Sequence, residues 1–184
     1  MIFKGTATAL ITPFTADGVD LDAFGKLLDE QVAGGVSAVV VLGTTGEPAT
    51  MTASEKLEVM KFAIRRLKGV IPVIIGTGSN NTAAAVELSV QAEKLGADAL
   101  LVVTPYYNKA TQRGLIAHYT AIADAVNIPI ICYNVPGRTG VNLLPATFAE
   151  LAEHPNIAAI KEASGNMEQI EEVIRLTRGK AVVY

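Results

Sequence analysis

The chain has 184 residues, of which 50% are hydrophobic and 18% are charged, enough apolar material for the core of one ordinary domain. Its formal net charge is −3, with acidic and basic residues interspersed, so it lacks a basic surface for nucleic acid or a membrane. The start of the sequence has no signal-peptide pattern, and no apolar run approaches membrane-spanning length. We therefore expect a cytoplasmic protein that acts on a small molecule.

Short apolar runs, bounded by Gly, Pro and small polar residues, recur about every thirty residues, which is the size of one strand-helix unit. Each run is typical of a buried β-strand. The pattern predicts seven strands, over residues 5–11, 38–43, 70–76, 99–104, 128–133, 157–161 and 181–184.

The segments between these strands carry apolar residues at helical spacing. Asp20 is a predicted N-cap for the first helix, and Thr52 with Glu55 forms a capping box for the second. A third helix opens at Thr82 and ends at Gly96. Three further helices are predicted over residues 111–126, 145–153 and 167–178. Regular strand-helix alternation indicates a parallel sheet covered by helices, either a closed eightfold barrel or an open doubly wound sheet.

Polar residues gather just after the predicted carboxyl ends of several strands. They stand at residues 43–47, 104–108, 133–138 and 161–164. Barrel enzymes assemble their sites at this face, so the distribution favours the barrel over the open sheet.

Lys161 ends an almost wholly apolar run, where a strand enters the core. An amine in an apolar pocket has a lowered pKa and becomes a nucleophile that forms an imine with a carbonyl compound; the alternative is a lysine that points into water. Because side chains alternate along a strand, Ile157, Ala159 and Lys161 should share one face of their strand. By the same alternation, Ile131 and Tyr133 should share one face of the neighbouring strand. If that face is the barrel interior, Lys161 and Tyr133 converge, and tyrosine or threonine hydroxyls can relay protons.

Other candidate residues have simple alternatives. The loop at residues 43–46 lacks the glycine spacing and lysine of a nucleotide-binding loop. Cys132 is the single cysteine, which excludes an internal disulfide, and we expect it to be a small buried hydrophobe. His118 and His154 have no partners at metal-ligand spacing, so no metal site is predicted.

The segments 43–47, 133–140 and 161–164 resemble, in order and spacing, the motifs of the dihydrodipicolinate synthase family. This family belongs to the pyruvate-dependent class I aldolases, together with N-acetylneuraminate lyase, and the likeness runs from Lys4 to the last residue. The resemblance implies a TIM (β/α)8 barrel in which Lys161 forms an imine with pyruvate.

The same resemblance implies roles for the surrounding residues. Thr44, Tyr133 and Tyr107 would be the proton relay, with Tyr107 reaching in from a neighbouring subunit of a homo-oligomer, a tetramer by resemblance. Thr45 would bind the pyruvate carboxylate, and Arg138 would bind the carboxylate of L-aspartate 4-semialdehyde. On the residues alone, Tyr106 and Tyr107 are better explained as plugs of the barrel mouth or of an interface. Arg138, likewise, is better explained as a helix cap or as the partner of a surface acid.

The implied reaction is the condensation of pyruvate with L-aspartate 4-semialdehyde to 4-hydroxy-tetrahydrodipicolinate, in diaminopimelate and lysine biosynthesis. No cofactor is needed, since the lysine imine is the electron sink. One alternative is another pyruvate-dependent aldolase, such as a sialate or 2-keto-3-deoxy sugar acid lyase, which typically lacks the 136–138 element. A non-catalytic barrel fragment and an open-sheet protein that binds a phosphorylated ligand are further alternatives.

The family's chains normally continue well past Tyr184. We therefore expect residues 1–184 to form one catalytic domain whose barrel is incomplete, with about six strands and the start of a seventh and without the carboxyl-terminal helical region. Unpaired strand edges and an open core would leave this chain with weak or no turnover on its own.

Overall fold

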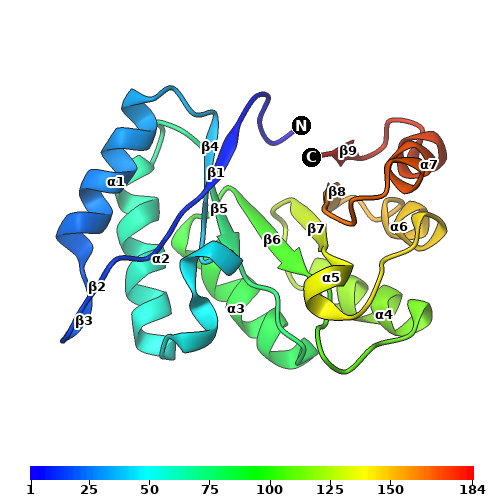
Figure 1. Ribbon diagram of the computed structural model, residues 1–184, viewed down its shortest axis with the longest axis horizontal. Coiled ribbons are helices and arrows are strands. Elements are labelled where there is room, and N and C mark those ends of the chain that lie inside the picture. Colours follow the sequence, from blue (N-terminus) through cyan, green and yellow to red (C-terminus); the bar gives the residue numbers. More distant parts are fainter.

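A parallel sheet of seven strands runs through the centre of the molecule, and the computed structural model describes all residues, 1–184. The sheet has the order β1-β4-β5-β6-β7-β8-β9, every neighbouring pair is parallel, and β1 and β9 lie at its two edges. Its strands are β1 (Ala7–Ala9), β4 (Ala38–Val41), β5 (Val73–Gly76), β6 (Ala99–Val103), β7 (Ile130–Asn134), β8 (Ile157–Glu162) and β9 (Val182–Val183). All seven predicted strands are confirmed, and the strands curl into part of a barrel (Figure 1).

Helices cover the outer side of this curl (Figure 1). They are α1 (Leu21–Ala33), α2 (Ala53–Leu67), α3 (Thr82–Leu95), α4 (Gln112–Ala123), α6 (Pro145–Leu151) and α7 (Met167–Thr177). Their ends follow the predicted caps: Asp20 accepts from the backbone N–H of Ala23, and Thr52 with Glu55 forms a complete capping box. Gly96 adopts a left-handed conformation at the end of α3, which favours glycine.

The sheet separates two apolar clusters. Residues that alternate outward along the strands, such as Val39, Ile75 and Leu100, belong to a large cluster of 35 buried residues that includes the helices. The opposite face carries a smaller cluster of nine buried residues, among them Val40 and Ile131. A strand that is buried on both faces has a continuous run of apolar residues, which is why the strands could be predicted from the sequence.

The two ends of the chain meet across the open side of the curl (Figure 1). The rings of Phe3 and Tyr184 stack with their centroids 4.3 Å apart, and the Tyr184 hydroxyl donates to the carbonyl of Phe3 at 3.0 Å. Ile2 and Phe3 also pack against the inner cluster. Residues before β1 therefore cover part of the apolar inner face.

One detail of the predicted alternation is wrong. The register between β7 and β8 shifts, so that Ile130 pairs with Ile157 but Ile131 pairs with Ala159. Ile157 consequently lies in the outer cluster while Ala159 lies in the inner one. The irregularity precedes Ala159, so the alternation from Ala159 onward, with Ala159 and Lys161 on the inner face, is unaffected.

Three short elements fall where no strand or helix was predicted. A hairpin of β2 (Phe14–Thr15) and β3 (Gly18–Val19) precedes α1, and the four-residue helix α5 (Pro136–Thr139) follows β7 directly. Their lengths leave no room for a periodic pattern, which explains why they escaped prediction. None of the helices has the length and apolar character needed to cross a bilayer.

Candidate active site

A cavity of about 150 Å³ lies at the carboxyl ends of the strands. Its lining consists of Ala9, Gly43, Thr44, Thr45, Leu101, Tyr133, Arg138 and Lys161. Five of the six predicted site residues therefore line one small cavity, although they come from three separate segments of the chain. The sixth, Tyr107, does not line it.

Lys161 occupies the inner face near the end of β8, directly opposite Tyr133 on β7. Its Nζ atom lies 4.4 Å from the centroid of the Tyr133 ring. The side chain is half-buried, and none of the four ion pairs of the protein involves it. The predicted convergence of Lys161 and Tyr133 thus matches the geometry.

Burial lowers the pKa of the Lys161 amine, and the positive charge of Arg138 lowers it further. The face of the Tyr133 ring attracts a cation and so opposes this shift in part. No carboxylate is paired with the amine to raise its pKa again, so the pKa stays lowered. A neutral amine at the edge of a cavity can attack a carbonyl carbon.

Thr44 and Thr45 lie in the 3₁₀ turn η1 (Thr44–Gly46), which follows β4 after Leu42 and Gly43. The hydroxyl of Thr12 donates to the carbonyl of Gly46 at 2.8 Å and holds the turn against the segment that follows β1. A Cβ atom at Gly46 would stand 3.2 Å from both the Leu10 carbonyl and the Thr12 hydroxyl. The turn is therefore packed closely on its inner side while both site threonines are exposed toward the cavity.

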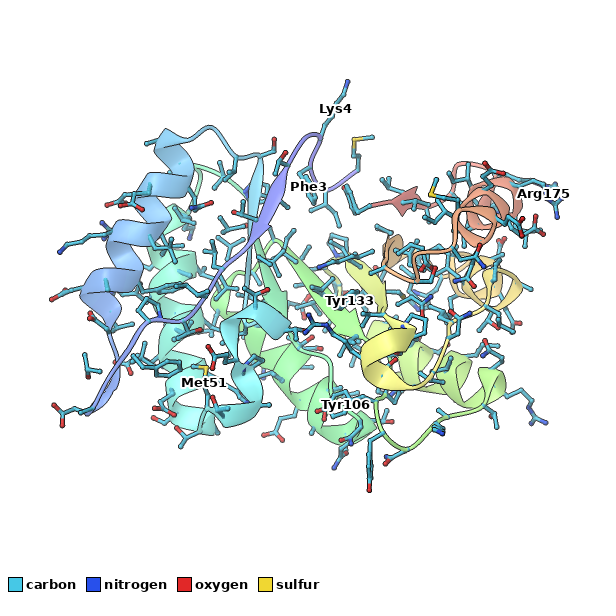
Figure 2. All side chains as sticks on the ribbon, in the orientation of Figure 1. Phe3, Lys4, Met51, Tyr106, Tyr133 and Arg175 are labelled. Carbon is cyan, nitrogen blue, oxygen red and sulfur yellow. The ribbon has the colours of Figure 1, made fainter.

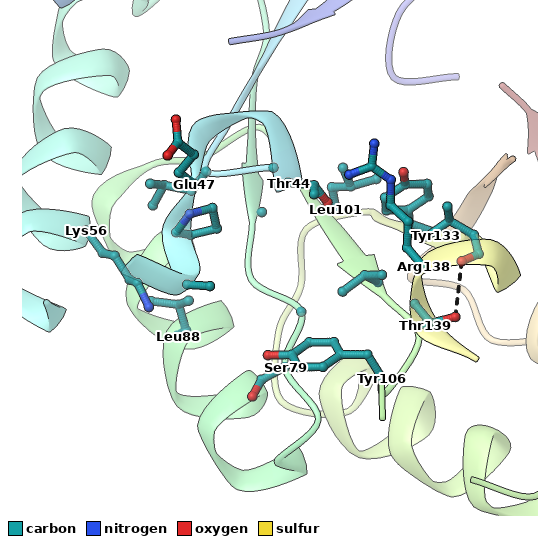
Figure 3. Close-up of a pocket in the computed structure, with 18 of the residues that line it drawn as sticks. Thr44, Glu47, Lys56, Ser79, Leu88, Leu101, Tyr106, Tyr133, Arg138 and Thr139 are labelled. Carbon is teal, nitrogen blue, oxygen red and sulfur yellow. Dashed lines mark hydrogen bonds between the residues drawn. The ribbon is translucent and has the colours of Figure 1, made fainter. Parts of the chain in front are cut away.

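Arg138 is carried by α5, the short helix that starts immediately after β7. The Thr139 hydroxyl donates to the carbonyls of Val135 and Val141, at 3.2 and 3.0 Å, and fixes both ends of this helix; Figure 3 draws one such bond. The small cavity has two basic residues and no acidic residue in its lining. Such a cavity favours a small anion.

A second cavity of about 360 Å³ adjoins the first and shares Thr44, Tyr133 and Arg138 with it. It extends to Tyr106 and, on α2, to Lys56; in Figure 3, Lys56 and Arg138 come from opposite sides of this space. Figure 2 places Tyr133 in the interior and Tyr106 below it. The larger cavity gives the site room for a second molecule beside a small one.

Tyr107 lies outside both cavities, with 87% of its surface exposed. Its backbone has φ of 72°, a left-handed conformation that is uncommon for a bulky residue. Its N–H donates to the carbonyl of Thr139 at 3.0 Å, so the strained position is tied to α5. Within one chain, Tyr107 does not contact the site residues that the sequence grouped with it.

The remaining candidate residues are explained by burial and by their hydrogen-bond partners. Cys132 is buried in the outer cluster, as predicted, and burial raises the pKa of its thiol. His118 is buried and its Nδ1 lies 2.9 Å from the Thr82 hydroxyl, whereas His154 pairs with Asp124. The structure contains no group of three or more His, Cys, Asp or Glu residues that could hold a metal ion.

Sequence reasoning missed the residues that hold the site in place. Thr12 supports the threonine turn, and Asn134 and Glu162 stand one residue beyond Tyr133 and Lys161 on the opposite face of the sheet. Strand alternation could have found the last two, since polar residues that follow an inward pair must face the helices.

Parallel strands that curl around an inner apolar face, with helices outside and a half-buried lysine in a cavity at the strand ends, define a protein of the β/α-barrel class. The family is more specific: the model of the Dihydrodipicolinate synthetase family matches residues 2–184. The chain belongs to this family.

Individual relatives agree with this assignment. The 4-hydroxy-tetrahydrodipicolinate synthase 1 of Clostridium acetobutylicum is 54% identical over 183 residues, which is 100% of this chain and 62% of that protein. The 4-hydroxy-tetrahydrodipicolinate synthase of Geobacter sulfurreducens is 54% identical over 95% of this chain and 60% of its own length. The chain thus spans less than two thirds of the length of these relatives.

Solved structures superpose closely on the whole chain. Dihydrodipicolinate synthase from Thermotoga maritima has a TM-score of 0.97 at 44% identity, over 100% of this chain and 64% of that chain. The chloride-inhibited dihydrodipicolinate synthase from Acinetobacter baumannii, solved in complex with pyruvate, has a TM-score of 0.96 at 48% identity, over 98% and 62%.

Proposed function

We propose that this chain carries the imine-forming site of a 4-hydroxy-tetrahydrodipicolinate synthase, which condenses pyruvate with L-aspartate 4-semialdehyde. The observation that carries the proposal is the Lys161 amine, half-buried against Tyr133 in a cavity that is also lined by the cation Arg138 and by no acidic residue. A keto acid supplies both the carbonyl that an amine attacks and the anion that such a cavity favours. The relatives named for this reaction support the same conclusion.

In the first step, the neutral Lys161 amine attacks the keto carbon of pyruvate. The carbinolamine loses water, and the resulting iminium joins Nζ to the former keto carbon. On the way to the iminium the amine nitrogen gives up one proton and keeps the other, while the former keto oxygen gains two protons and leaves as water. The Tyr133 and Thr44 hydroxyls, which line the same cavity, are placed to carry these protons. Thr45 provides a hydroxyl donor for the pyruvate carboxylate.

In the second step, the iminium loses a methyl proton and becomes an enamine, whose carbon attacks the aldehyde of the second substrate. Arg138 lines both cavities and so stands close to the imine, and a guanidinium binds a carboxylate through two parallel hydrogen bonds, which suits it to that substrate's carboxylate. The larger cavity, which shares Arg138 with the smaller one, accommodates this molecule. The amine of the aldehyde substrate then displaces Lys161, and ring closure releases the product without a cofactor.

Tyr107 enters this proposal through assembly. Its exposed side chain, held in a left-handed backbone conformation, suits the role of a relay residue that is donated to the site of a neighbouring copy. A homo-oligomer, with a tetramer as the proposed form, would complete the relay of Thr44, Tyr133 and Tyr107. A cytoplasmic location accords with a biosynthetic role of this kind.

Borohydride reduction in the presence of pyruvate tests the proposal. The reductant converts the imine into a stable secondary amine, and peptide mass mapping then locates the added group. We expect the tag on the peptide that contains Lys161, and none on peptides that contain exposed lysines such as Lys68. A folded sample in which Lys161 stays untagged would contradict the proposal and favour a non-catalytic role.

A further inference from the structure

A polar network lies directly behind the proposed imine site, on the helix-facing side of the sheet. Tyr133 and Lys161 are paired on the inner face, and the next pair in the register of β7 and β8 joins Asn134 to Glu162. Since consecutive strand residues point to opposite faces, this second pair lies under α7. Asn134 is fully buried, and Glu162 is partly buried.

The Glu162 carboxylate accepts hydrogen bonds from three groups. Asn134 Nδ2 lies 3.2 Å from Oε1 and 2.9 Å from Oε2, the backbone N–H of Ser164 lies 2.7 Å from Oε1, and Gln169 Nε2 lies 3.1 Å from Oε2. No ion pair of the protein involves Glu162. The carboxylate is thus held by neutral donors alone, one of which, Gln169, stands in the first turn of α7.

The network continues to the segment that follows α5. Asn134 Nδ2 donates to Asn142 Oδ1 at 2.8 Å, and the backbone N–H of Leu143 donates to Asn134 Oδ1 at 2.9 Å. Asn142 and Gln169 exchange two side-chain hydrogen bonds, at 2.8 and 3.1 Å. The Glu162 carboxylate therefore joins the ends of β7 and β8, the first turn of α7 and the segment next to the helix that carries Arg138.

Both oxygens of the Glu162 carboxylate accept hydrogen bonds, so the network requires an acceptor at each of the two positions. A glutamine at position 162 would present an amide NH₂ to donors on at least one side, which leaves a partly buried N–H without an acceptor. The end of β8 would then lose its fixed position relative to β7. Lys161 is the residue that precedes Glu162, so a displacement of the strand end moves the amine.

We propose that Glu162 is a positioning residue for the imine reaction: its carboxylate fixes the end of β8, so that the Lys161 amine keeps its place against Tyr133 and near Arg138. This inference rests on the proposed function, because it assigns Glu162 a role in the reaction of Lys161. Glu162 itself faces the opposite side of the sheet and does not touch the substrate.

The test compares Glu162→Gln with Glu168→Gln, which makes the same change in charge at an exposed residue of α7 that has no side-chain hydrogen bond. For each protein, the rate of borohydride trapping is measured against pyruvate concentration and pH and is expressed per folded molecule. The titration of the Lys161 amine is measured separately by NMR with labelled lysine, in the absence of pyruvate.

We expect Glu162→Gln to lower the maximal trapping rate by about tenfold or more, since small misplacements of reacting groups cost up to about a hundredfold. Its Lys161 titration should move to higher pH, toward that of an exposed lysine, because the displaced amine gains solvent. Glu168→Gln should leave both quantities unchanged. If Glu162→Gln does not fold, Gln169→Ala removes one donor and should change both in the same direction by less.

Two results separate the possibilities. If Glu162→Gln lowers only the melting temperature, while the titration and the trapping rate per folded molecule match those of Glu168→Gln, the network is structural and the positioning role is wrong. If the unaltered protein is never trapped with pyruvate, but the Lys161 titration still moves in Glu162→Gln, the proposed function fails while the positional link between Glu162 and Lys161 survives.

Discussion

The ends of β7 and β8 present two different faces to their surroundings. On the inner face, Lys161 has no carboxylate partner, and its amine lies beside an aromatic ring and near Arg138. On the outer face, one residue further along, Glu162 and Asn134 are extensively hydrogen-bonded. The same strand ends thus carry Lys161, which has no ion-pair partner, and Glu162, whose carboxylate is fully hydrogen-bonded. In the proposed reaction, the bonded outer face would hold the strand ends in place while the amine on the inner face stays free of any ion pair.

The largest effect is expected from Lys161→Met, which keeps an unbranched side chain and removes the nucleophile. Trapping of pyruvate should fall below detection, because no other group of the small cavity is an amine. Lys68→Met, at an exposed residue after α2, is the matched control and should be trapped like the unaltered protein. Persistent tagging of the Lys161→Met protein at another site would contradict the assignment.

Tyr133→Phe keeps the ring beside Lys161 and removes only the hydroxyl. We expect the trapping rate to fall by about a hundredfold, within the range for the loss of a positioned proton donor and acceptor. Tyr119→Phe also removes a hydroxyl, one that donates to the Val102 carbonyl on the helix-facing side, so it controls for lost stability. Equal trapping rates per folded molecule in the two variants would exclude a relay role for Tyr133.

Arg138→Ala should separate the two substrates. A nearby positive charge disfavours the ammonium form, so its removal raises the pKa of Lys161, and the rising limb of the trapping rate moves to higher pH. Pyruvate trapping at high pH should survive, whereas binding of L-aspartate 4-semialdehyde to the protein that carries the reduced pyruvate adduct should weaken by about tenfold to a hundredfold. An unchanged pH profile would show that the charge of Arg138 does not reach the amine.

The smallest effect is expected from Thr12→Val, which removes the hydroxyl that donates to the Gly46 carbonyl. Denaturant unfolding should show a loss of about 1 kcal/mol, the usual net value of one hydrogen bond, and pyruvate half-saturation should rise because the turn that carries Thr45 loosens. The exposed Thr6→Val is the control. A stability loss without any change in half-saturation would limit Thr12 to a structural role.

The inner face with Lys161 could be predicted from the sequence to a large extent, whereas the outer face with Glu162 could not. Strand spacing predicted that Lys161 and Tyr133 meet and that the polar segments 43–47 and 133–138 lie at the same end of the sheet, because a parallel β/α repeat fixes where strand ends meet. The family resemblance then singled out Thr44, Thr45 and Arg138 within those segments. Side-chain hydrogen bonds do not repeat along the sequence as strands and helices do. The only sign of the Glu162 network in the sequence was therefore a polar residue on the face of a strand that packs against helices.

Two further features lay beyond sequence reasoning. The shift of register at Ile157 depends on how β7 and β8 pair, and pairing is set by tertiary packing rather than by the sequence of either strand. The position of Tyr107 depends on its left-handed backbone, which directs the side chain outward. Sequence resemblance alone supplied the expectation that this residue serves another copy.

The most direct test of the central claim is carbon NMR of pyruvate labelled at its keto carbon and mixed with the folded protein. The account predicts a new resonance in the imine range that correlates with the side chain of Lys161 and disappears in Lys161→Met. A folded protein that gives only free and hydrated pyruvate at every pH up to the titration of Lys161 would contradict the claim that this amine is the nucleophile.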